Sequence, residues 1–402
     1  MIRSVWERVA AVILEMRVLI AGGGTGGHLY PGIAVAETLV ARHPETRIRF
    51  VGTVRGIERR VVPELGYDLS TIRARGLPRR ARRDLLALVR SLADQLVGVL
   101  QSIGLVLRYR PDVVIGTGAY VSAPVVVAAK LARCPCVVLE QNRVPGRTNR
   151  LLARLADEVH LTFSESRRYF GRKDNLRLTG NPIRPGLVLR DRSPALDSFG
   201  LAAEKTTLLV FGGSRGAHRI NLALVEALPL LARIRKLQLL VQTGDEDLEM
   251  VRQAVAGVPI RASVHRYLDD IALGYSVAGL VVCRAGATTL AELTACGLPS
   301  ILVPYPHAAD DHQRWNAEKL VQHGAAVSIA DEELTGKRLA RVVRRLVLSP
   351  NHLHRMAVQA RILARPEAAL RVAESVERLA GLGDPADVGG DTGTRVAAGD
   401  GE

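Results

Sequence analysis

Short apolar runs alternate with longer amphipathic segments along most of this chain. The runs at 18–21 and 208–211 contain only apolar side chains, which is typical of parallel strands that helices cover on both faces. The same signal predicts strands at 17–21, 47–52, 112–116, 136–140 and 158–162, and again at 207–211, 237–242, 261–264, 279–283, 300–303 and 325–328. The predicted fold class is therefore α/β, with two Rossmann-like domains whose parallel sheets face a cleft.

The predicted helices fill the intervals between these strands. In the first half they cover 31–42, 56–65, 84–109, 121–132, 145–155 and 165–170. In the second half they cover 219–234, 246–255, 269–276, 288–296, 311–322 and 333–347, followed by one long helix at about 353–381. Strand and helix thus alternate twice, as expected for two doubly wound sheets.

A chain of 402 residues is long for a single core, which favours two domains. The predicted division is an N-terminal extension at 1–15, a first domain at 16–185, a linker rich in proline and charge at 186–200, a second domain at 201–350, a helical segment at 351–381 and a disordered tail at 382–402.

The net charge of +15 indicates an anionic partner, which charge alone leaves open between nucleic acid, a phosphorylated substrate and an anionic membrane. Aromatic residues make up only 4% of the chain and are not interleaved with the arginines, so no nucleic-acid partner is expected. The four cysteines form no CxxC pair, which indicates reduced thiols and a cytoplasmic location.

Two glycine-rich loops each stand between a predicted strand and a predicted helix, at 22–28 and 212–218. Glycines let a ligand approach the backbone, and the helix that follows offers free N–H groups to a phosphate. The first loop formally matches the dinucleotide fingerprint, but the second strand ends at Thr53 without the acid that holds a ribose. The sequence therefore disfavours NAD.

Several ordered motifs together resemble the MurG family of glycosyltransferases, over about residues 16–380. They are Gly23-Gly-Thr-Gly-Gly-His28, Pro31-Gly-Ile-Ala34, Arg75-Gly76, Gly116-Thr-Gly-Ala-Tyr-Val-Ser122, Glu140-Gln-Asn142, Gly180-Asn-Pro-Ile-Arg184, Gly212-Gly-Ser-Arg-Gly-Ala217, Cys283-Arg-Ala-Gly-Ala-Thr-Thr-Leu-Ala-Glu292 and His312-Gln-Arg-Trp-Asn316. The resemblance implies an inverting GT-B enzyme that moves GlcNAc from UDP-GlcNAc to the MurNAc 4-hydroxyl of lipid I, giving lipid II. It also implies a peripheral protein on the cytoplasmic face of the cell membrane.

The resemblance implies a set of donor-binding residues, which are Thr25, Gly26, Gly27, Asn142, Arg184, Ser214, Leu268, Ala287, Thr288, Thr289, Glu292 and Gln313. Glu292 lies one turn into a helix, where its carboxylate either accepts the ribose hydroxyls or only favours the helix dipole. The backbone of Leu268 would contact the uracil, unless the residue only packs in the core. The family often has Gln where this chain has His312 and Arg215, so the contacts of these two positions stay open.

His28 is the first candidate for the catalytic base and Glu140 the second. An imidazole titrates near neutrality and can take the proton of a sugar hydroxyl, although His28 can instead bind the lipid diphosphate or position its loop. Asp245 and Asp247 mimic the DxD motif of metal-dependent transferases, but their place before a helix favours a capping role. Helix dipoles and backbone N–H groups can neutralise a leaving diphosphate, so neither a metal nor a cofactor is expected.

Six arginines precede the apolar helix predicted at 84–109, and they are Arg73, Arg75, Arg79, Arg80, Arg82 and Arg83. This segment is either a solvated charge run before a core helix or a surface that rests on anionic lipid. If the protein has no lipid-facing surface, a GT-B transferase with another acceptor or a UDP-GlcNAc 2-epimerase is favoured instead. A nucleotide-sugar-binding regulator without catalysis is the alternative from another class.

Overall fold

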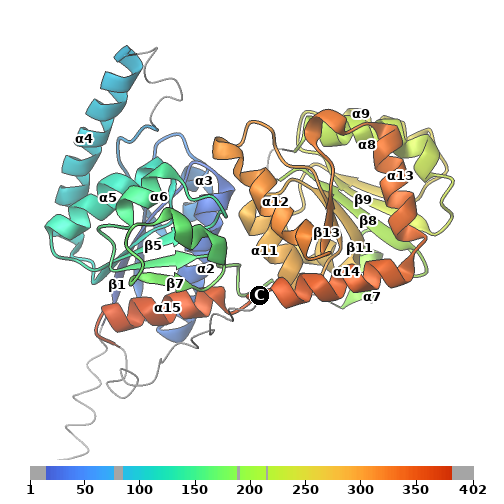
Figure 1. The fold of residues 1–402 in the computed structure, drawn as a ribbon. Coiled ribbons are helices and arrows are strands. Elements are labelled where there is room, and N and C mark those ends of the chain that lie inside the picture. Colours follow the sequence, from blue (N-terminus) through green and yellow to red (C-terminus); the bar gives the residue numbers. More distant parts are fainter. Residues whose placement is uncertain (1–14, 77–84, 188–190, 214–215, 383–402) are drawn as a thin grey trace, which may run out of the picture.

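The computed structural model describes residues 15–76, 85–187, 191–213 and 216–382. Two all-parallel sheets stand side by side, each flanked by helices (Figure 1). The first has the strand order β3-β2-β1-β4-β5-β6-β7 and the second the order β10-β9-β8-β11-β12-β13. In each sheet the first three strands are added in one direction, and the fourth lies on the other side of the first, as in Rossmann-like sheets. The predicted α/β class is therefore confirmed.

The first unit contains strands β1 (Arg17–Ala21), β2 (Arg47–Gly52), β3 (Asp68–Thr71), β4 (Val113–Gly116), β5 (Cys136–Glu140), β6 (Glu158–Leu161) and β7 (Leu176–Leu178). Its helices are α2 (Gly26–Arg42), α3 (Glu58–Glu64), α4 (Leu85–Tyr109), α5 (Ala119–Leu131), α6 (Arg147–Leu152) and the 3₁₀-helix η1 (Ser164–Tyr169). Strands β3 and β7 were not predicted, because these short edge strands are only partly buried and lack an apolar run.

The second unit contains strands β8 (Thr206–Phe211), β9 (Leu237–Gln242), β10 (Ala262–His265), β11 (Ala278–Cys283), β12 (Ser300–Leu302) and β13 (Ala326–Ser328). Its helices are α7 (Arg192–Ser198), α8 (His218–Leu231), α9 (Leu248–Ala256), α10 (Ile271–Val277), α11 (Ala287–Cys296), α12 (His312–Gln322) and α13 (Gly336–Val347), with short 3₁₀ turns at Ala309–Asp311 and Asp331–Glu333.

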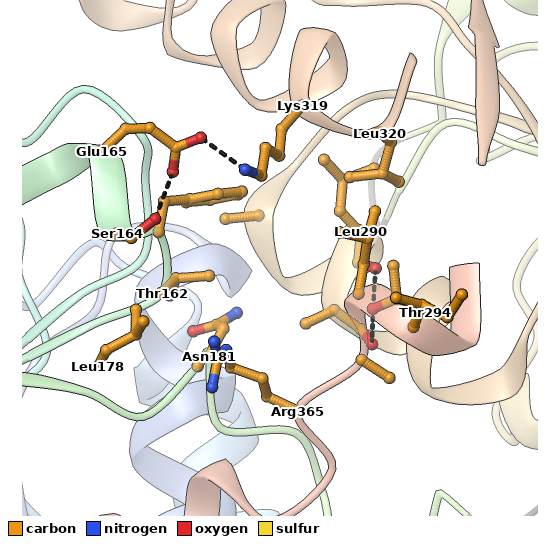
Figure 2. A pocket seen from close by; sticks show the side chains of 17 residues that line it. Thr162, Ser164, Glu165, Leu178, Asn181, Leu290, Thr294, Lys319, Leu320 and Arg365 are labelled. Carbon is orange, nitrogen blue, oxygen red and sulfur yellow. Dashed lines mark hydrogen bonds and ion pairs between the residues drawn. The ribbon is translucent and has the colours of Figure 1, made fainter. Parts of the chain in front are cut away.

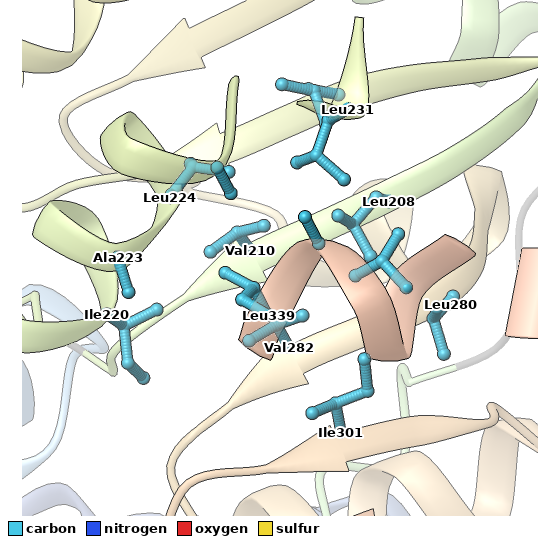
Figure 3. Packing of buried hydrophobic residues seen from close by; sticks show 14 of the residues in the cluster. Leu208, Val210, Ile220, Ala223, Leu224, Leu231, Leu280, Val282, Ile301 and Leu339 are labelled. Carbon is cyan, nitrogen blue, oxygen red and sulfur yellow. The ribbon is translucent and has the colours of Figure 1, made fainter. Parts of the chain in front are cut away.

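Alternate residues of the central strands pack on opposite faces of the second sheet. Leu208 and Val210 of β8 lie in one cluster with Leu224 of α8 and Leu339 of α13, all four labelled in Figure 3. Leu209 and Phe211 lie in the cluster on the other face. Because both faces are covered, the four side chains from Leu208 to Phe211 are all apolar, which is why the run was continuous in the sequence.

Two predicted segments contain structure that the sequence did not indicate. The predicted linker at 186–200 contains α7, whose Ala195 and Leu196 are buried in a cluster of the second unit. The single helix predicted at 353–381 is two helices, α14 (Pro350–Leu363) and α15 (Ala368–Leu379). The break includes Pro366, which removes a backbone donor and disfavours helical geometry in the residue before it.

The break sends α15 back to the first unit (Figure 1). Val372 and Val376 pack in the cluster beneath β1 and α2. At the end of the helix, Glu377 accepts hydrogen bonds of 2.6 and 2.9 Å from the guanidinium of Arg42. Arg378 donates a bond of 2.9 Å to the buried carboxylate of Glu158. The last described helix therefore completes the first unit, although it follows the second in the sequence.

The Glu158 site makes a prediction about stability and pH. Burial alone would raise the pKa of Glu158, but hydrogen bonds from His160 and Arg378 outweigh it and lower the pKa to about 2. The resulting stabilisation is complete above the ordinary value of 4.5 and is lost as the pH falls toward 2. Glu158→Gln should lower the free energy of unfolding at pH 7 by about 1–3 kcal/mol and flatten its fall below pH 4.5, measured by urea unfolding.

The matched control is Glu333→Gln, which removes an exposed ion pair with Arg338 and should change stability little. An equal effect of the two substitutions at pH 7 would contradict the importance of the buried carboxylate.

Candidate active site

The carboxyl ends of both sheets face each other where the two units meet. Asn181 of the first unit donates a hydrogen bond of 3.2 Å to the Thr288 hydroxyl at the start of α11. Asn316 of α12 donates one of 3.1 Å to Oδ1 of Asn142 and accepts one of 3.0 Å from the backbone of Arg143. Of the predicted donor-binding residues, Asn142 and Thr288 thus each take part in a hydrogen bond between the two units.

A cavity of about 300 Å³ lies between the units beside these contacts. Figure 2 shows that Glu165 and Lys319 approach each other across it, from η1 and α12, and their ion pair measures 2.7 Å. Asn181 and Arg365 lie at its opposite side (Figure 2). Since both units and the crossover segment before α15 line this space, a change in their separation must reshape it.

The first glycine loop encloses a buried carboxylate that the sequence interpretation missed. Glu58 is 0% exposed and accepts bonds of 2.8 Å from the backbone N–H groups of Gly24 and Thr53. A Cβ at Gly23 or Gly52 would overlap this side chain. These glycines thus make room for an acid inside the protein. The burial of Glu58 could not be predicted from the sequence, because its contacts join three separate segments.

His28 lies in the first turn of α2, directly after this loop. Its Nδ1 lies 3.1 Å from the carbonyl oxygen of Thr117, so Nδ1 carries the proton of the neutral ring and Nε2 carries the lone pair. Burial lowers the pKa of His28, and the neighbouring imidazole of His312 across the interface lowers it further. The ring is therefore neutral near pH 7, which is the state a base requires.

Glu140, at the end of β5, is held inside the protein by four N–H contacts. It accepts from the backbone of Asn142 at 2.8 Å and of Gly146 at 3.1 Å, and from the side chains of Asn149 at 2.8 Å and Asn142 at 3.4 Å. Burial raises the pKa of Glu140 to about 7, although these bonds oppose the rise. Both carboxylate oxygens already hold the loop that carries Asn142.

Glu292 is 9% exposed on α11, and its Oε2 accepts a hydrogen bond of 2.8 Å from the phenol of Tyr275. Burial raises the pKa of Glu292, whereas the Tyr275 bond and the charge of Arg184 lower it. Gln313, in the first turn of α12, accepts from the backbone N–H groups of Ala285 at 3.1 Å and Tyr305 at 3.0 Å. Its orientation is therefore fixed, and its amide NH₂ is the end that remains to meet a ligand.

Leu268 packs its side chain in the core, and its backbone N–H donates to Oε1 of Gln242 at 3.0 Å. Gln242 in turn donates to the carbonyl of Gly213 at 3.0 Å, so one buried amide links the second glycine loop to the Leu268 segment. Sequence reasoning missed Gln242 because it ends a strand and belongs to none of the motifs. Ser214 and Arg215 lie outside the described residues.

The remaining predicted residues lie at two helix starts and at the junction. Thr25, Gly26 and Gly27 begin α2, and Ala287 and Thr289 begin α11, whose N-cap Gly286 offers no side-chain cap. The guanidinium of Arg184 lies 5.4 Å from the centre of the Tyr30 ring.

The expected capping role of Asp247 is wrong. Asp247 stands at the N-cap of α9 but makes no side-chain cap bond there. Its carboxylate instead lies 2.6 Å from Nδ1 of His218 and accepts a bond of 2.7 Å from Asn221, both on α8. Across the described ranges, no group of three or more His, Cys, Asp or Glu side chains is placed to hold a metal ion.

Two facing Rossmann-like units with this cleft define a GT-B glycosyltransferase. Family models agree, since "Glycosyltransferase family 28 N-terminal domain" matches residues 18–161 and "Glycosyltransferase family 28 C-terminal domain" matches 207–373. The chain belongs to glycosyltransferase family 28 and, within it, to the MurG group that the following relatives represent.

Two curated relatives bear the name UDP-N-acetylglucosamine--N-acetylmuramyl-(pentapeptide) pyrophosphoryl-undecaprenol N-acetylglucosamine transferase. The one from Geotalea uraniireducens is 46% identical over 90% of this chain and 98% of its own, and the one from Myxococcus xanthus is 47% identical over 89% and 92%. The solved MurG structure from Acinetobacter baumannii has a TM-score of 0.71 and 28% identity, over 90% of this chain and 99% of that one.

The site makes a prediction at Gly118, which has φ +95° and where a Cβ would lie 3.0 Å from Nδ1 of His28. Gly118→Ala should destabilise the protein by about 1 kcal/mol or more, because alanine disfavours this backbone geometry. Gly104→Ala, inside α4 with open space around it, should instead be neutral or stabilising by about 0.5–1 kcal/mol. Thermal unfolding compares them, and equal melting temperatures would contradict the strain argument.

Proposed function

We propose that this chain transfers GlcNAc from UDP-GlcNAc to the MurNAc 4-hydroxyl of undecaprenyl-diphospho-MurNAc-pentapeptide (lipid I), with inversion at the anomeric carbon. The supporting observation is the junction of the two units, where α2 packs on α11, which carries Glu292, and where His28 lies near His312 at the start of α12. The curated relatives, which carry the name of this transferase, support the same donor and acceptor.

The donor is proposed to lie against the second unit. Glu292 would accept the ribose hydroxyls, the backbone of Leu268 would contact the uracil, and the amide NH₂ of Gln313 would reach the sugar hydroxyls. The uncapped N–H groups at the start of α11, at Ala287, Thr288 and Thr289, would hold the diphosphate. These dipoles stabilise the departing UDP, and the proposal involves neither a metal nor a cofactor.

His28 is proposed as the base for the acceptor hydroxyl, because its ring is neutral and its Nδ1 is oriented by the Thr117 carbonyl. The four N–H contacts of Glu140 favour a positioning role for that carboxylate instead. Asn142 and Arg184 would then approach the donor from the first unit when the cleft is closed.

The membrane surface is proposed to be one face of α4. In the first half of α4 the inward face is small and polar, and Ser91 donates to the carbonyls of Arg75 at 3.2 Å and Gly76 at 3.1 Å, whereas Val106 near its end is buried in the core. Its outward face carries leucines, of which Leu96 is 64% and Leu100 62% exposed. The helix thus exposes a row of leucines to solvent, with Arg75 beside it in an ion pair with Asp94, which favours anionic lipid over the core-helix alternative. Arg79, Arg80, Arg82 and Arg83 lie outside the described residues.

None of the described helices combines the length and the apolar character that a membrane crossing requires. We propose peripheral attachment through α4 on the cytoplasmic face, where the lipid-linked acceptor would present its headgroup to the cleft.

Incubation of the protein with radiolabelled UDP-GlcNAc and a lipid I analogue tests the proposed reaction. The label should appear in the lipid fraction with release of UDP. Conversion of UDP-GlcNAc to its 2-epimer without transfer, or donor binding with no turnover, would instead support one of the alternatives.

His28→Ala should lower kcat by at least ~100-fold and leave the KM for UDP-GlcNAc nearly unchanged, because a general base contributes about 10²–10⁴-fold to rate. The exposed His354→Ala serves as the control. A large loss of acceptor affinity with little change in kcat would assign His28 to acceptor binding.

The double substitution Leu96→Glu and Leu100→Glu should weaken binding to anionic vesicles by about tenfold or more, because inserting each leucine is worth roughly 1.5–3 kcal/mol. Leu348→Glu, at a residue 56% exposed in the second unit, is the matched control. Co-sedimentation of the unmodified chain should also weaken with salt. Equal binding to neutral and anionic vesicles at low and high salt would contradict the electrostatic part, and normal binding of the double variant would contradict the role of α4.

A further inference from the structure

Tyr275 is a buried residue of α10 to which the proposed reaction assigns no part. Its side chain is 1% exposed, and its ring centre lies 6.1 Å from that of Phe211 at the end of β8. A phenol inside an apolar cluster needs a partner for its hydroxyl. Here the partner is Oε2 of Glu292, at 2.8 Å.

We propose that Tyr275 is a positioning residue that orients the Glu292 carboxylate toward a nucleotide with an intact ribose. The inference rests on the proposed function, in which Glu292 accepts the ribose hydroxyls. A carboxylate is free to turn about its last side-chain bond, and the Tyr275 bond holds one oxygen of Glu292 in place. The remaining lone pairs then keep a fixed direction, so a vicinal diol can donate two hydrogen bonds without reordering the acceptor.

The phenol also favours the charged form of this acceptor. Burial raises the pKa of Glu292, and the Tyr275 bond opposes that rise. Removing the hydroxyl should therefore raise the pKa of Glu292 further, so that the carboxylate takes up its proton at a higher pH. Protonation removes acceptor capacity. On acidification, a variant without the hydroxyl should therefore lose affinity for UDP-GlcNAc at a higher pH than the unmodified protein does.

Kinetics of Tyr275→Phe in the full chain test the inference, because this change removes one oxygen and keeps the buried ring. The KM for UDP-GlcNAc should rise about three- to tenfold with kcat within about twofold. The preference for UDP-GlcNAc over its 2′-deoxyuridine analogue should shrink, and the acidic limb of kcat/KM should move to higher pH. The matched control is Tyr67→Phe in the first unit, where the ring centres of Tyr67 and Phe50 lie 5.4 Å apart. This change should leave the KM, the ribose preference and the pH profile unaltered.

Glu292→Ala is measured alongside to separate the two claims, and it should raise the KM for UDP-GlcNAc by about tenfold or more. If Glu292→Ala raises the KM but Tyr275→Phe behaves like Tyr67→Phe in KM, ribose preference and pH profile, the positioning role is overturned and the ribose role stands. If a folded Glu292→Ala keeps its KM, the ribose role itself fails, and the inference fails with it.

Discussion

The return of α15 to the first unit is the constraint on which the shape of the cleft depends. The chain leaves the first sheet after β7, builds the second unit, and then crosses back to bury Val372 and Val376 beneath β1. Two connections therefore join the units, and the ion pair of Glu377 with Arg42 fixes the second one. This double tether keeps α11 and α12 opposite the start of α2, where the short polar contacts of Asn142 with Asn316 and of Asn181 with Thr288 form.

The first glycine loop and the start of α11 are both candidate phosphate sites, but they have different surroundings. The first loop closes over the buried carboxylate of Glu58, which already occupies the N–H of Gly24. A negative group beneath this loop opposes a second anion at the same N–H. Neither α2 nor α11 has a side-chain cap, and helix starts of this kind attract a diphosphate, so the carboxylate beneath the first loop is the feature that separates the two sites. These charges support an arrangement in which the second unit binds the nucleotide and the first unit supplies His28.

The central strands could be predicted closely from the sequence, because helices cover both sheet faces and most strand positions are therefore apolar. Strands β1, β2, β5 and β9 begin and end at the predicted residues, although polar side chains stand at some of their ends. The edge strands β3 and β7 were not predicted, because they are only partly buried and lack an apolar run. The break before α15 was missed although Pro366 marks it, because the apolar pattern continues on both sides.

The site was predictable only where its residues belong to recognisable motifs. Glu292, Gln313, Asn142 and His28 belong to such motifs, and their roles remain proposals. The buried partners Glu58, Gln242 and Tyr275 were not predictable, because each acts through contacts between segments that are distant in sequence. The leucines of α4 were visible as an apolar helix, but only the packing of Ser91 and Gly98 against other segments shows which face is turned outward.

Amide hydrogen exchange with and without UDP tests most directly whether the nucleotide binds to the second unit. The account predicts that UDP slows exchange most at 286–292 and around Leu268, with a smaller effect at 22–28. Protection centred on 22–28, with exchange at 286–292 unchanged, would contradict it and place the nucleotide on the first unit.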